Sequence, residues 1–155
     1  MSTANFLKNK ILNPLKSLLQ QGLTAEALAK SLAAGAVLAV FPVFGITSLL
    51  CVLVAAKLQL NQVAIQIANY CAYPLQFLLF IPFIRFGETL FGLDTVAINP
   101  DRIAGLIGQD FSQFLTLYGQ AIAAACAAWL LVALPAMLTL SKGLLFVLGR
   151  VTQKN

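Results

Sequence analysis

Five polar side chains with helical spacing form the pattern in this sequence most able to do chemistry. They are Gln62, Gln66, Asn69, Tyr73 and Gln76. Successive members lie four, three, four and three residues apart, which places all five on one stripe of a helix. An amide left unpaired against lipid costs several kcal/mol. The stripe is therefore expected to face protein or water.

Two interpretations of this polar stripe remain open. The stripe either supplies hydrogen bonds between helices, each worth roughly 0.6 to 2 kcal/mol, or lines a polar path or binding groove. We prefer the hydrogen-bonding interpretation, although five polar residues on one face are more than one helical hairpin needs.

Few other residues could carry out catalysis. The sequence has no histidine, the commonest zinc ligand and general base. It also lacks paired carboxylates within its apolar runs, a phosphate-binding glycine loop and a cysteine with a nearby base. Cys51, Cys71 and Cys126 lie far apart in apolar runs, where small buried hydrophobes are expected. We therefore expect no enzyme activity, no cofactor and no metal site.

The composition indicates a membrane protein. Of its 155 residues, 60% are hydrophobic and only 10% are charged, which is outside the usual range for a soluble domain. Residues 31–56, 58–84 and 111–141 lack charged side chains, and each run exceeds the roughly 20 residues that cross a bilayer. The net charge of +5 comes mainly from the two ends of the chain, which favours membrane orientation over nucleic-acid binding.

Pro42 and Gly45 interrupt the first apolar run. Proline lacks a backbone donor and clashes with the preceding turn, and glycine tolerates the positive φ that ends helices. We predict a broken helical hairpin over about residues 24–57, with Thr24 as its N-cap. Its arms, of roughly 17 and 11 residues, are short for full crossings. A re-entrant hairpin is therefore preferred to a single proline-kinked span.

The placement of lysine and arginine supports this choice, because these residues favour the cytoplasmic side. A re-entrant hairpin returns Lys57 to the cytoplasm, places the acidic segment 85–110 outside, and leaves both basic ends inside. A single span would put the basic C-terminal tail outside. We predict an inner-membrane, multi-pass protein with cytoplasmic N- and C-termini.

The sequence divides into three parts: a basic amphipathic N-terminal segment (1–22), a membrane core (23–92) and a C-terminal part (93–155). The core is expected to hold the hairpin and a transmembrane helix over about 61–84 that Pro74 and Pro82 bend. The C-terminal part is expected to hold an outer amphipathic helix over about 101–117, a final transmembrane helix over about 118–141 and a basic tail. Arg85 and Glu88, three residues apart, are expected to pair at the interface.

Several residues of the core match a known spacing pattern. They are Gly35, the block Pro42-Val43-Phe44-Gly45-Ile46-Thr47, Leu60-Asn61, Pro74 and Arg85-Phe86-Gly87. On these residues the chain resembles the bacterial membrane family called domain of unknown function 2062. The family pattern usually has Asn-Pro where this chain has Tyr73-Pro74, and Asn69 could supply that amide one turn earlier. The resemblance implies an inner-membrane protein of no assigned activity, sometimes joined to glycosyltransferase-type domains.

Two functions follow from these patterns. The first is an oligomeric transport or channel-like component that uses the hairpin and the polar stripe, since two spans and one hairpin are too few to enclose a path. No acidic residue lies in a predicted span, which favours passive or lipid-related movement. The second is a structural or accessory protein that scaffolds a partner enzyme or a lipid-linked substrate. The expected partners are the lipid bilayer and either a second copy or another membrane protein.

Overall fold

The computed structural model describes residue 17 and residues 23–152. These residues form helices and no strand, which confirms the all-α fold class. The helices are α3 (Ala25–Ala39), α4 (Thr47–Leu58), α5 (Gln62–Phe91), α6 (Pro100–Gln109) and α7 (Phe111–Thr152). The predicted N-terminal segment, apart from Ser17, lies outside the described residues.

The broken hairpin forms where the sequence predicts it. α3 begins after Thr24, whose hydroxyl accepts a hydrogen bond from the backbone N–H of Ala27 at 3.1 Å. It ends at Ala39, three residues before Pro42. Gly45 adopts a φ of +85°, in the region that side chains disfavour, and turns the chain into α4.

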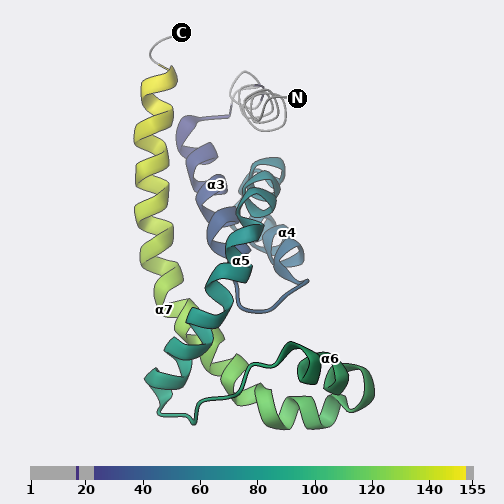
Figure 1. Cartoon of the computed structure of the whole chain (residues 1–155). Coiled ribbons are helices and arrows are strands. Elements are labelled where there is room, and N and C mark those ends of the chain that lie inside the picture. Colours follow the sequence, from purple (N-terminus) through teal and green to yellow (C-terminus); the bar gives the residue numbers. More distant parts are fainter. Residues whose placement is uncertain (1–16, 18–22, 153–155) are drawn as a thin grey trace, which may run out of the picture.

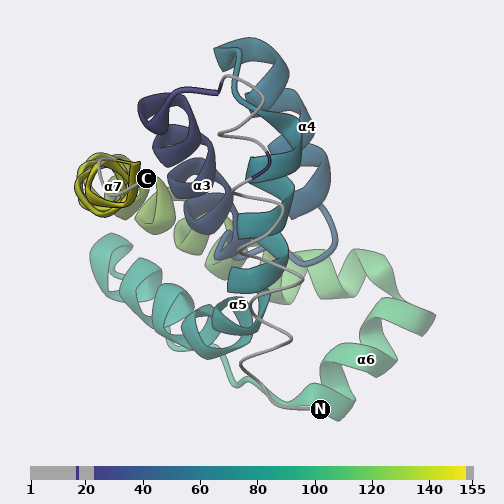
Figure 2. The same ribbon diagram turned by 90° about the horizontal axis from the view of Figure 1, so that it is seen from above.

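α3, α4, α5 and the second part of α7 lie side by side, whereas α6 and the first part of α7 lie across their lower end in Figure 1. α3 runs parallel to α5, because contacts advance along both helices in the same order: Ser31 accepts a hydrogen bond from the N–H of Asn61 at 2.9 Å, and Gly35 lies against the Ile65–Ala68 turn. α4 runs antiparallel to α5, since Gln62 meets Val52 and Gln66 meets Ser48. Viewed from above, α3 lies between α7 and the pair formed by α4 and α5 (Figure 2). The starts of α3 and α5 and the ends of α4 and α7 therefore share one end of the bundle.

Small residues let α3 approach α5 at backbone distance. A Cβ added to Gly35 would lie 2.8 Å from the Ala68 Cβ and would collide with the carbonyl of Ile65. Gly87 of α5 approaches α7 in the same way, since its added Cβ would lie 2.5 Å from the Ala124 carbonyl carbon. Close approach through small residues strengthens van der Waals packing between helices that lie in lipid.

Three predicted boundaries differ from the structure. α5 continues past residue 84 to Phe91, because a charged residue such as Arg85 ends an apolar run without ending a helix. Gly92, whose φ is +62°, caps the helix after Phe91. The amphipathic helix predicted over 101–117 is divided at Asp110, whose carboxylate accepts a hydrogen bond from the N–H of Gln113 at 2.9 Å. Its second half is continuous with the final helix, which extends from Phe111 to Thr152 instead of ending near 141.

Two of the described helices, α5 and α7, are long and apolar enough to cross a membrane. Each contains prolines: Pro74 and Pro82 in α5, and Pro135 in α7. Figure 1 shows both helices bent, and an interior proline bends a helix by removing a hydrogen bond and clashing with the preceding turn.

The contact at Gly35 predicts a large cost for one added methyl group. Gly35→Ala should lower the free energy of unfolding by about 1–3 kcal/mol, since the backbone of α5 must move. Gly119→Ala is the matched control, because the space around that helical glycine is open, and it should be neutral or stabilise by up to about 1 kcal/mol. Denaturant unfolding followed by the fluorescence of the one tryptophan measures both. Equal effects would contradict the backbone contact.

Candidate functional site

The break between α3 and α4 leaves backbone carbonyls that no helix can satisfy. Pro42 has no N–H, and the N–H of Phe41 turns back to the carbonyl of Leu38 at 3.1 Å. The carbonyl of Val37, one turn before Phe41, is met by the indole N–H of Trp129 at 3.3 Å. A residue of α7, 92 positions further along the chain, thus satisfies a carbonyl at the end of α3.

Gln76 of α5 satisfies the carbonyls on the two sides of Pro42. Its side-chain nitrogen donates to the carbonyl of Phe41 at 2.7 Å and to that of Val43 at 3.3 Å. The side chain is fully buried. Since both partners are carbonyls, only the NH₂ group can face them, and the orientation of the amide is fixed.

Aromatic rings hold the turn against α5 and α7. The Phe44 ring lies 5.1 Å from that of Phe77 and 4.9 Å from that of Phe80, measured between centroids. The Phe41 ring meets Trp129 edge-on at 4.9 Å. Such pairs add about 0.5–1.5 kcal/mol each beyond burial, so the turn has one defined position.

The polar stripe faces the hairpin, and four of its five members donate to it. Besides Gln76, Gln62 donates to the carbonyl of Val52 at 3.0 Å and Gln66 to the carbonyl of Ser48 at 3.0 Å. Asn69, which is fully buried, donates to the hydroxyl of Ser48 at 3.2 Å. The hydrogen-bonding interpretation of these four residues is thus the one that the contacts support.

Tyr73 and Pro74, the other members of the stripe region, make different contacts. The Tyr73 ring packs edge-on against Phe77 at 5.7 Å. Pro74 lies inside α5 with its ring exposed. The side-chain amide that contacts the hairpin is therefore that of Asn69, one turn before the position where the family pattern usually has asparagine and this chain has Tyr73.

Three amide oxygens of the stripe are buried without a hydrogen-bond partner among the described residues: those of Gln66, Asn69 and Gln76. Buried polar atoms are satisfied in the great majority of folded proteins. An amide whose nitrogen is bound while its oxygen is not retains the capacity to accept hydrogen bonds.

Asn61 and Thr47 begin helices at opposite ends of the α4–α5 pair. The side-chain oxygen of Asn61 accepts from the N–H of Ala64 at 2.9 Å and caps α5. Thr47 is buried at the first position of α4. The contact of Asn61 is therefore a helix cap, which is a structural role.

Arg85 and Glu88 form the predicted ion pair, with nitrogen and oxygen 2.7 Å apart, and together they hold one residue of the following loop. Arg85 donates to the carbonyl of Val96 at 3.2 Å, and Glu88 accepts from the N–H of Val96 at 2.9 Å. The Glu88 side chain is only 4% exposed. This pair anchors the segment between α5 and α6 to the end of α5.

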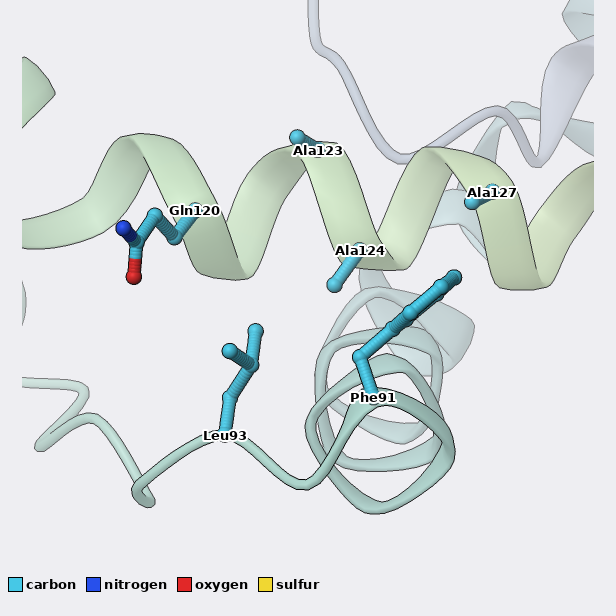
Figure 3. A pocket seen from close by; sticks show the side chains of 6 residues that line it. All are labelled: Phe91, Leu93, Gln120, Ala123, Ala124 and Ala127. Carbon is cyan, nitrogen blue, oxygen red and sulfur yellow. The ribbon is translucent and has the colours of Figure 1, made fainter.

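Mostly apolar side chains line a groove beside the end of α5. This groove, of about 340 Å³, lies between the end of α5 and the first half of α7. Figure 3 shows Phe91 reaching toward Ala124 and Ala127, with Gln120 as the polar side chain on its edge. No group of three or more metal-ligating side chains occurs in the described ranges.

Sequence reasoning missed three residues that complete these contacts: Trp129, Ser48 and Val96. Trp129 lies within the last apolar run of the sequence, but its partner, the carbonyl of Val37, is set by tertiary packing. Ser48 carries a signal that could have been used, since a polar side chain in the first turn of a short apolar helix must find a partner.

Comparison with known proteins gives a family and nothing finer. The family model described as "Uncharacterized protein conserved in bacteria (DUF2062)" matches residues 9–154. No curated protein and no solved structure matches the chain.

The two carbonyls held by Gln76 predict the effect of removing that amide. Gln76→Leu should lower the free energy of unfolding by about 1–3 kcal/mol, because it leaves buried carbonyls unpaired. Gln62→Leu is the matched control on the same stripe, where the side chain is exposed, and should change stability by no more than about 0.5 kcal/mol. The same denaturant experiment compares the two variants. A Gln76→Leu variant as stable as the wild type would refute the role of Gln76 in stabilising the break through these two carbonyls.

Proposed function

This chain belongs to the DUF2062 family of bacterial proteins, whose model covers residues 9–154, and on that premise we propose that it is a multi-pass protein of the inner membrane. Nearly the whole chain is matched, beyond the core region whose motifs carry the resemblance.

Exposed apolar surface supports placement in a bilayer. Only 22% of the most apolar stretch of α5 and 33% of that of α7 is buried within the protein. Leu78 of α5 and Leu134 of α7 are 70% and 73% exposed. Apolar surface this extensive is rare on soluble monomers, and lipid is the partner that the proposal assigns to it.

Positive charge predominates at one end of the bundle. That end, where α3 and α5 begin and α4 and α7 finish, carries Lys30, Lys57, Lys142 and Arg150, with Glu26 paired to Lys30 at 2.7 Å. The opposite end, where α6 lies (Figure 1), carries Asp94, Asp101 and Asp110 together with Arg102 and the Arg85–Glu88 pair. Under the positive-inside rule the lysine-bearing end faces the cytoplasm.

The lengths of α3 and α4 support a re-entrant hairpin. They have 15 and 12 residues, which gives about 22 Å and about 18 Å against a hydrocarbon thickness of about 30 Å. Because the two helices run in opposite directions, the hairpin enters and leaves by the cytoplasmic side. A single kinked span would instead need α4 to continue the direction of α3.

The role that we propose is structural: a membrane component that scaffolds a partner enzyme or a lipid-linked substrate, without catalysis of its own. The observation that supports this role is the hydrogen bonding at the break between α3 and α4, where Gln76 of α5 and Trp129 of α7 pair with its free carbonyls and hold the hairpin in place. A hairpin held in this way presents a constant surface to a partner. The amide donors of the stripe bond to the hairpin, which supports a structural role over the lining of a path.

A transport-like role is the second candidate, and the unpartnered oxygens of Gln66, Asn69 and Gln76 favour it. Non-helical backbone at membrane depth is tolerated beside protein or water, and broken helices recur in transporters. One chain is too small to enclose a path, so this role requires an oligomer.

The topology predicts the location of three reporter fusions. Reporters fused after Lys57, Asp94 and Asn155 should report cytoplasm, periplasm and cytoplasm, because the hairpin returns and α5 and α7 each cross once. Paired alkaline phosphatase and green fluorescent protein fusions measure this. A periplasmic Lys57 would exclude the re-entrant hairpin.

The two roles predict different stoichiometries. For the structural role we expect a monomer by native mass spectrometry in detergent. In a background without the three native cysteines, Asn69→Cys should then resist water-borne thiol reagents, whereas Gln62→Cys at the exposed start of α5 should react. A stable homo-oligomer with a reactive Asn69→Cys would favour transport instead.

A further inference from the structure

A second apolar groove, of about 190 Å³, is lined by residues of α3, α4 and α7. α3 lies between the other two helices (Figure 2), so it forms the floor of the groove with Ala34, Val37 and Leu38, and its neighbours form the walls. Every lining side chain is hydrophobic. An apolar cavity of about 150 Å³ is large enough to bind benzene, so this groove can hold a segment of a hydrocarbon chain.

The groove opens to the surroundings of the bundle. Leu58 of α4 and Leu130 and Leu134 of α7 line it and are exposed. Trp129 lines the end nearer the break; it is buried, and its indole N–H donates to the carbonyl of Val37. The lining residues therefore offer only hydrocarbon surface to a ligand, and an acyl chain of the surrounding bilayer matches that surface.

Two lysines lie one helical turn beyond the opposite end of the groove. This is the end of the bundle at which α3 begins and α4 finishes. Lys30 precedes Ala34 by four residues, and Lys57 follows Val54 by three. Residues three or four apart share a face of a helix, so each lysine continues a face that lines the groove. Both side chains are exposed.

The charge at this end of the groove favours an anion. Lys30 pairs with Glu26 at 2.7 Å, but both side chains are more than half exposed, and an exposed pair of this kind is weak. Glu26 also lies one turn further from the groove than Lys30 does. Lys30 can therefore exchange this carboxylate for a phosphate, and Lys57 adds a second positive charge from α4.

We propose that this groove binds an acyl chain of an anionic phospholipid whose phosphate lies at Lys30 and Lys57. Lysine is a common phosphate ligand, and basic residues at a membrane surface attract anionic headgroups. Lysine side chains also extend toward the membrane interface while their carbon chains cover apolar surface. The inference rests on the proposed placement in a bilayer, but not on which side of the membrane the lysines occupy.

The single tryptophan of the chain reports on the groove, because Trp129 lines it. Met137, which lines the groove eight residues later, lies about 12 Å along α7 toward the lysine-bearing end. Bromine atoms in the middle of a bound acyl chain therefore come close to the indole and quench its fluorescence. In vesicles that mix phosphatidylglycerol and phosphatidylcholine, with one lipid brominated at a time, brominated phosphatidylglycerol should quench the full-length protein at several-fold lower mole fractions than brominated phosphatidylcholine.

Neutral variants test the two lysines. Lys30→Gln combined with Lys57→Gln should abolish the preference, so that both brominated lipids quench equally at equal mole fraction. Lys142→Gln combined with Arg150→Gln is the matched control, since it removes the same charge from the same end of the bundle. Lys142 lies five residues after Met137 and thus about 140° round the helix from it. The control should keep the preference, and its loss in both variants would overturn the groove site in favour of general attraction to a basic surface.

The wild-type protein alone can also overturn the proposal. Equal quenching by the two brominated lipids would exclude the site and leave the placement in a bilayer intact. Quenching by neither lipid, in protein that does not float with the vesicles, would contradict the placement as well. A preference that inorganic phosphate abolishes at constant ionic strength would assign the lysines to a free anion instead of a lipid.

Discussion

The need to satisfy the backbone groups released at Pro42 governs this structure. A proline in the middle of an apolar run frees carbonyls that would cost several kcal/mol if they were buried unpaired. Gln76 and Trp129 come from two other helices to meet them. The positions of α5 and α7 against α3 are set by these bonds as much as by apolar contact, because each donor must lie within hydrogen-bond reach of a specific carbonyl.

Backbone contact between helices makes that alignment possible. The absence of a side chain at Gly35 brings α3 against the Ile65–Ala68 turn of α5, and Gly87 does the same for α5 against α7. Helices this close leave little freedom to slide past one another. The aromatic contacts of Phe44 then fix the turn itself. Polar and apolar contacts thus specify one arrangement of the hairpin.

The sequence predicted the features that depend on local rules. The Pro42–Gly45 break, the Thr24 cap and the single polar stripe from Gln62 to Gln76 each follow from residue type and spacing. The partner of each amide could not be predicted, because it depends on how far α4 slides along α5. Trp129 meets Val37 through packing that no local pattern encodes. The break at Asp110 could not be predicted either, because an aspartate can lie within an exposed helical turn or cap the start of the next helix.

The hydrogen bonds at the break join residues that are made at different times during synthesis. The carbonyls at the end of α3 emerge early, but Gln76 lies 35 residues after Phe41 and Trp129 lies 92 residues after Val37. The first apolar unit to be made is thus the last to have its polar groups paired. In the proposed membrane setting, these carbonyls need another hydrogen-bond partner, such as water, until α5 and α7 have been made.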